Sequence, residues 1–191
     1  MMDRQERLDR QERMDRQERL DRLFAEMTAY YSGDPRRVQH FVKVHGFAAL
    51  IGRMEKLDPA VQEVLEAAAY VHDIGIRPAE EKYGRCDGKL QEQEGPAAAR
   101  EMLKGLGFDE ALVERVCWLV GHHHTYDRID GMDYQILVEA DFLVNLYESF
   151  QDCHPAQKAF GQEGKAAAAS ALEKIFRTGS GSRICRTMFG L

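Results

Sequence analysis

Histidines and aspartates at four separate places in this chain have the types and spacing of metal ligands. His40 falls in the middle of an expected helix, and His72 and Asp73 are adjacent near a helix end. Three successive histidines, residues 122–124, follow Gly121 at another helix end. Imidazole and carboxylate groups are the ligands that Zn, Fe, Mn and related divalent ions use in proteins. These segments together indicate a metal site.

Asp141 has the strongest need for a partner. It lies inside the apolar stretch 136–146, and burying a carboxylate without a partner is costly. A metal ion would stabilise it, and so would an arginine or a helix N-terminus. The sequence alone leaves these three partners open.

The adjacent pair His72-Asp73 has a geometric problem. Neighbouring residues on a helix point about 100° apart, so both cannot face one side of a straight helix. Gly75 is expected to end this helix, and in the last turn both side chains can reach a single ion. The alternative for such a pair is a terminal histidine beside a solvated aspartate.

The same reasoning applies to the three histidines. Three successive residues cannot all face one point, so we expect one or two of them to face the centre, and we favour His122 and His123. The alternative is a surface cluster that binds metal adventitiously.

Helices must position these groups. Apolar residues recur at helical spacing from Leu20 onward, Asp34-Pro35 and Asp58-Pro59 are typical helix starts, and no segment alternates like a strand. The pattern predicts an all-α fold. Helices are expected over 20–31, 35–51, 59–73, 90–106, 109–121, 132–150 and about 155–176, with a polar loop at 78–88.

The first 22 residues repeat DRQERL or DRQERM. The apolar residues Leu8, Met14 and Leu20 are six apart, so each lies about 120° around the helix from the last and no coiled-coil seam forms. We expect a solvated helical arm, with a partner-binding arm as the alternative. The expected division is an arm at 1–22, a domain at 23–177, and a linker with a short tail at 178–191.

Composition excludes several classes. The chain has 191 residues and a net charge of −6, which disfavours duplex nucleic acid as a partner. It has no apolar run long enough to span a bilayer and no apolar secretory segment near its start. The four cysteines are widely spread with no CxxC pair, as expected for reduced thiols. These features predict a cytoplasmic protein with no membrane partner.

The ordered set of histidines and aspartates, with the phrase His72-Asp73-Ile74-Gly75, resembles the HD superfamily of metal-dependent phosphohydrolases over about residues 35–150. The resemblance implies a single helical-bundle domain, here with an N-terminal helical extension, and a divalent ion between its helices. The metal ligands that it implies, including two for a second ion, are His40, His72, Asp73, His122, His123 and Asp141.

At two positions the match between this chain and the family pattern is open to another assignment. His45 competes with His40, but His40 shares a helix face with Val44 and Ala48, whereas His45 lies about 140° away. Relatives with two ions often carry a histidine where this chain has Gln91, so Glu92 or Glu94 is an additional candidate ligand; a solvated first helical turn is the alternative. One or two ions are therefore expected, and Fe, Mn, Zn, Mg and Ni are not distinguished.

The resemblance implies an enzyme that hydrolyses a phosphomonoester or phosphodiester, with a nucleotide as the expected small phosphorylated substrate. Asp73 is the expected catalytic residue, bridging ions or orienting the attacking water. Lys89 and Arg77 are candidate cations for the phosphoryl group, and an ordinary solvated loop is their alternative. A di-iron oxygenase and a non-catalytic, metal-stabilised module that binds a nucleotide or a protein remain alternative functions. A homo-oligomer is left open.

Overall fold

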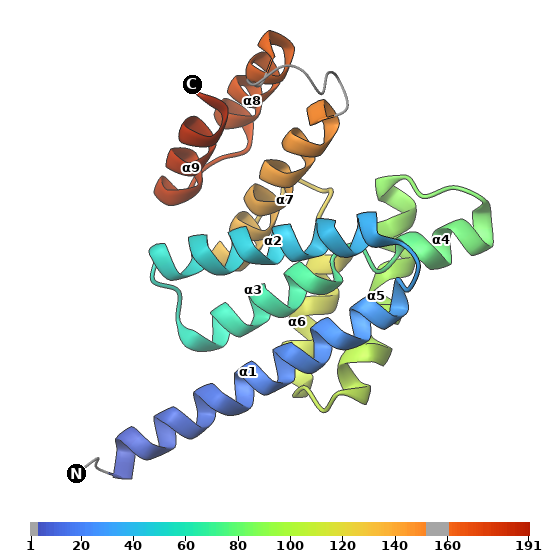
Figure 1. Cartoon of the computed structure of the whole chain (residues 1–191). Helices are drawn as coiled ribbons and strands as arrows, with labels where there is room; N and C mark the ends of the chain where they lie inside the picture. Colours follow the sequence, from blue (N-terminus) through green and yellow to red (C-terminus); the bar gives the residue numbers. More distant parts are fainter. Residues whose placement is uncertain (1–3, 152–160) are drawn as a thin grey trace.

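The computed structural model describes residues 4–151 and 161–191, and within these ranges the chain is helical and contains no strand (Figure 1). The predicted all-α fold is confirmed. None of the described helices is both long and apolar enough to cross a bilayer. The helices are α1 (Arg4–Tyr30), α2 (Pro35–Met54), α3 (Pro59–Val71), α4 (Ile76–Tyr83), α5 (Gly88–Gly105), α6 (Glu110–Val120), α7 (Met132–Gln151), α8 (Gln162–Lys174) and α9 (Gly179–Phe189).

Aspartates in the sequence set the starts of four helices. The side chains of Asp34, Asp58, Asp87 and Asp109 each accept a hydrogen bond from a backbone N–H in the first turn of α2, α3, α5 and α6. In α2 and α3 a proline follows the cap, where its missing N–H costs no helical bond. These caps fix where the helices that carry the histidines begin.

The bundle is centred on α3, which packs against α2, α6 and α7, while α2 also packs against α7 (Figure 1). Small and branched side chains at these contacts are fully buried: Val44, Ala48, Ile51, Ala68, Val71, Leu137 and Ala140. Their burial stabilises the junction by about 25 cal/mol per Å² of apolar surface. The packing places His40 on α2 and Asp141 on α7 beside the C-terminal end of α3.

The N-terminal arm continues into the bundle as one helix, α1, whose first turns project from the body (Figure 1). Leu8 and Met14 are 50% and 56% exposed, whereas Leu20 is 5% exposed. An ion pair of 2.6 Å joins Arg19 to Glu63 of α3, where the helix reaches the body. Because α1 continues unbroken past residue 22, the division between arm and domain stays a prediction.

The expected loop at 78–88 is wrong in its first half, because residues 76–83 form α4. Pro78 is the third residue of this helix, where a backbone N–H has no helical partner to lose. Gly84, with φ +65°, ends the helix. The polar composition therefore reflects an exposed short helix.

The expected linker and tail at 178–191 is also wrong, because residues 179–189 form α9. The hydroxyl of Thr178 accepts a hydrogen bond from the N–H of Gly181. Buried Glu139 of α7 accepts hydrogen bonds from the N–H groups of Arg177 and Thr178. A long-range carboxylate thus fixes the start of a glycine- and serine-rich helix. The helix expected from about residue 155 begins at Gln162, and its earlier part lies outside the described residues.

Candidate metal centre

A tight turn follows α3 and carries the His-Asp pair. The helix ends at Val71, and the N–H of Ile74 donates to the Val71 carbonyl at 2.9 Å. The hydroxyl of Tyr31 donates to the backbone carbonyl of Asp73 at 2.8 Å. This turn brings His72 Nε2 within 3.5 Å of Asp73 Oδ2. Both side chains therefore face the same point, although they are adjacent in sequence.

Gly75 allows α5 to lie directly against this turn. A Cβ atom at residue 75 would lie 2.4 Å from the backbone oxygen of Gln91 and 2.8 Å from the backbone nitrogen of Gly95. Both obstacles are backbone atoms, which cannot rotate away. The close approach of α5 thus requires glycine at residue 75.

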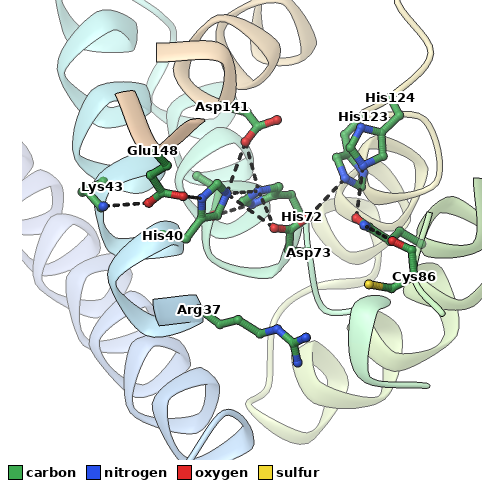
Figure 2. A network of polar contacts seen from close by, with 12 residues as sticks. Arg37, His40, Lys43, His72, Asp73, Cys86, His123, His124, Asp141 and Glu148 are labelled. Carbon is green, nitrogen blue, oxygen red and sulfur yellow. Dashed lines mark hydrogen bonds and ion pairs between the residues drawn. The ribbon is translucent and has the colours of Figure 1, made fainter. Parts of the chain in front are cut away.

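Four of the expected ligands come together from α2, the turn after α3, and α7 (Figure 2). His40 Nε2 lies 3.3 Å from His72 Nε2 and 3.3 Å from Asp141 Oδ1. His72 Nε2 lies 3.6 Å from the same Asp141 oxygen. Asp73 Oδ2 lies 3.4 Å from His40 Nε2. We call His40, His72, Asp73 and Asp141 the first cluster.

The tautomer of His72 follows from its surroundings. Its Nδ1 lies 3.0 Å from the carbonyl oxygen of Ala69, which can only accept, so Nδ1 donates. In the neutral ring the lone pair is then on Nε2, which points into the first cluster. This is the form of histidine that binds a metal ion.

A second group of possible ligands consists of Asp73, His123 and His124, and we call it the second cluster. His123 Nε2 lies 3.5 Å from Asp73 Oδ1, and His123 Nδ1 donates to the carbonyl of Val120 at 2.8 Å. The rings of His123 and His124 are 4.0 Å apart between centroids. Asp73 therefore presents Oδ2 to the first cluster and Oδ1 to the second.

His122 is not in either cluster, contrary to the expectation. Its ring stacks on Trp118 with 4.3 Å between centroids, and its Nδ1 donates to the Trp118 carbonyl at 2.7 Å. His124 takes the expected place beside His123. Its ring lies against the start of α5, where a Cβ at Gly88 would be 2.7 Å from the ring. The turn after α6, which spacing rules do not describe, decides which histidines face the centre.

The additional candidates lie outside both clusters. Glu92 accepts hydrogen bonds from the N–H of His124 and the hydroxyl of Thr125, so it holds the histidine turn. Glu94 is paired with Lys82 at 3.0 Å.

Arg77 and Lys89, the two candidate cations for the phosphoryl group, also lie outside both clusters. Arg77 is paired with Glu81 at 3.0 Å and donates to the Tyr30 carbonyl, and Lys89 is exposed. Gln91 places its Oε1 3.1 Å from His124 Nε2 and thereby contacts the second cluster.

Buried atoms without partners test whether these residues fit a metal ion. Four buried side-chain atoms of the described residues lack a hydrogen-bond partner, and two of them, His123 Nε2 and Asp141 Oδ1, lie in the two clusters. Such atoms are costly to bury unless something else binds them. Ligands about 2.1 Å from one tetrahedral ion lie roughly 3.4 Å from one another. The separations of 3.3–3.6 Å in the first cluster match that value. The donor set fits a divalent ion.

The charges of the site point the same way. Burial alone would lower the pKa of His40, but the nearby carboxylates of Asp141 and Asp73 outweigh burial and raise that pKa to about 9. Burial opposes ionisation of Asp73, yet the charge of His72 holds the pKa of Asp73 well below its usual range. Burial and the neighbouring His123 lower the pKa of His124 to about 4. Asp73 and Asp141 are therefore ionised, and a divalent ion would offset their charge.

Sequence reasoning missed two residues of the centre. Glu148 on α7 contacts His40 Nδ1 at 3.0 Å, and its position seven residues after Asp141 was an available signal. Arg37, labelled in Figure 2, lies one helical turn before His40. Its guanidinium pairs with Glu80 at 2.7 Å. Glu80 belongs to α4, a segment that was expected from the sequence to be a loop.

Comparison with known proteins gives a consistent result. A family model described as the HD domain matches residues 37–171. A crystal structure of a predicted HD superfamily hydrolase from an uncultured Thermotogales bacterium is similar to the chain, with a TM-score of 0.59 and 26% sequence identity. That match covers 91% of this chain and 84% of the other. No curated protein sequence matches the chain.

Proposed function

The chain belongs to the HD domain family, and we propose that it is a metal-dependent phosphohydrolase. The solved structure to which it is similar is that of a predicted HD superfamily hydrolase. The proposed substrate is a phosphomonoester or phosphodiester, and specifically a nucleotide. The observation that carries the proposal is the position of Asp73, which offers one carboxylate oxygen to each of two histidine clusters. That arrangement suits a residue that holds a reacting water between two ligand groups.

We propose that the first cluster holds one divalent ion and that Asp73, His123 and His124 hold a second. An ion bound there would polarise a phosphoryl oxygen and lower the pKa of a water molecule toward neutrality. The ionised carboxylate of Asp73 can accept a hydrogen bond from that water and orient it toward phosphorus. The donor set is compatible with Fe, Mn, Zn, Mg or Ni.

Arg37 is the best-placed cation for the substrate, in place of Arg77 and Lys89. It is on α2, three residues before His40, and its guanidinium lies 5.4 Å from the ring centre of Tyr31, whose hydroxyl holds the Asp73 carbonyl. A guanidinium matches phosphate oxygens in a bidentate manner. We propose that Arg37 exchanges its partner Glu80 for a phosphoryl group of the substrate.

Asp73→Ala tests this function, with metal content and turnover measured together on a panel of nucleotides and phosphomonoesters. We expect the variant to lose bound metal and to lose hydrolysis of any substrate that the wild-type protein cleaves. His122→Gln is the matched control, because His122 lies beside the centre but faces Trp118. Full turnover by Asp73→Ala without bound metal would contradict the proposal.

The remaining partner and location expectations stay predictions. The proposed partner is a small phosphorylated molecule, and a homo-oligomer is left open. A cytoplasmic location agrees with Cys86, Cys117 and Cys185, which form no disulfide in the described residues. Cys153 lies outside the described residues.

A further inference from the structure

The outer side of His40 has a partner that the proposed reaction does not use. Glu148 Oε2 lies 3.0 Å from His40 Nδ1, on the opposite side of the ring from the first cluster (Figure 2). We propose that Glu148 is a positioning residue that fixes the tautomer and ring orientation of His40 for metal binding. This inference rests on the proposed function, because it assumes that the first cluster binds an ion.

The fold explains why Glu148 can reach His40. Glu148 follows Asp141 by seven residues, which is nearly two full turns of α7. Both carboxylates therefore project from the same face of α7, toward α2. One helix thus supplies a proposed metal ligand and the partner of another ligand.

The contact determines which nitrogen of His40 keeps its proton when the ring binds an ion in its neutral form. An ionised carboxylate only accepts hydrogen bonds, so Nδ1 must donate to Glu148. The neutral ring then has its lone pair on Nε2, which faces Asp73 and Asp141 at 3.4 and 3.3 Å. The side chains of His40 and Glu148 are only 11% and 16% exposed, so water does not readily replace this contact. Carboxylate partners of this kind orient metal-binding histidines and increase their basicity.

Lys43 determines how the group at residue 148 is oriented toward His40, so that exchanging one oxygen of Glu148 for nitrogen changes the contact with His40. Its ammonium group donates to Glu148 Oε1 at 2.6 Å, and an ammonium group has no acceptor. In the variant Glu148→Gln the amide oxygen is therefore held by Lys43, and the amide NH₂ faces His40 Nδ1. That amide donates to Nδ1 and selects the tautomer with hydrogen on Nε2, which cannot bind an ion there.

A second histidine on the same helix provides a matched control. His45 Nε2 lies 3.3 Å from Glu66 Oε2, and the Glu66 side chain is 15% exposed, close to the 16% of Glu148. The His45 ring stacks on Tyr70 with 3.9 Å between centroids and belongs to neither cluster. Glu66→Gln therefore removes another partly buried carboxylate–histidine ion pair, away from the metal centre.

The test is a titration of the full-length, metal-free protein with Co²⁺, followed by calorimetry and by the visible absorption of the bound ion. We expect Glu148→Gln to weaken Co²⁺ binding by on the order of tenfold to a hundredfold. We expect Lys43→Met and Glu66→Gln to leave the affinity close to that of the wild-type protein. The double variant Lys43→Met/Glu148→Gln should recover much of the lost affinity, because the amide can then turn its oxygen toward His40.

The recovery in the double variant separates positioning from a general loss of packing, since a merely structural role of Glu148 predicts further damage when Lys43 is also changed. Unchanged affinity in Glu148→Gln, or equal losses in Glu148→Gln and Glu66→Gln, would overturn the positioning role and leave the proposed function intact. A wild-type protein that binds no Co²⁺ would refute both the proposed function and this inference.

Discussion

The substitution Tyr31→Phe tests how the N-terminal helix supports the metal centre. Tyr31, directly after α1, is 4% exposed, and its hydroxyl donates to the backbone carbonyl of Asp73 at 2.8 Å. Phenylalanine keeps the ring and removes only this donor. The carbonyl of the turn that carries both His72 and Asp73 is then left without its side-chain donor.

The expected loss can be worked out from that contact. The Asp73 carbonyl keeps a second donor, the N–H of Ile76 at 3.0 Å, so the variant loses one of two hydrogen bonds to this oxygen, worth about 0.5–1.5 kcal/mol. In a chain of this size each kcal/mol lowers Tm by about 2–4 °C, so Tm should fall by about 1–6 °C. Tyr30 is a matched control because its hydroxyl contacts the carbonyl of Ile74 at a longer 3.3 Å and its ring is half-buried. Water can replace that donor, so Tyr30→Phe should cost less than about 0.5 kcal/mol.

Thermal unfolding of the metal-free proteins, followed by circular dichroism, measures these losses, and Co²⁺ titration measures the effect on the site. We expect Tyr31→Phe to lower both Tm and Co²⁺ affinity, and Tyr30→Phe to change neither by much. A wild-type Tm in Tyr31→Phe, or equal losses in the two variants, would refute the reasoning that this hydroxyl holds the turn.

Three further predictions concern the turn, the histidine assignment and the ion. Gly75→Ala should destabilise the protein by more than about 3 kcal/mol in urea unfolding, since the new Cβ meets backbone on α5; Gly46→Ala, in open space on α2, should be neutral or stabilising, and similar values for the two would contradict this. His123→Ala should lower the number of Co²⁺ ions bound, whereas His122→Gln should not; a lower number in both variants would instead support the pair His122 and His123 expected from the sequence. Co²⁺ at a hundredfold excess over Kd should stabilise the wild-type protein by about 2.7 kcal/mol, and Asp141→Ala should lose this gain. Equal stabilisation of wild type and Asp141→Ala in the same unfolding assay would argue against a role for Asp141 in binding.

Local signals predicted much of the fold. Asp-Pro pairs and helical apolar spacing act within a few residues, so α2 and α3 begin where the sequence indicates. The start of α9 was missed because its stability depends on Glu139, some forty residues earlier. A glycine- and serine-rich segment looks like a linker until that buried carboxylate is known.

The candidate site could be predicted only in part. The residues of the first cluster were named from type, order and family resemblance, and the structure brings them together. Whether His122 or His124 faces the second cluster depends on the turn after α6, in which the ring of His122 stacks on Trp118. Glu148 and Arg37 were missed because their roles depend on which helices pack together, and that is not a local property of the sequence.

Anomalous diffraction from crystals grown with Co²⁺ would show whether the first cluster binds an ion. We expect a cobalt peak among His40, His72, Asp73 and Asp141, within bonding distance of their side chains. A well-ordered structure with no peak at that point, with these four groups paired only to one another or to protein cations, would contradict this expectation.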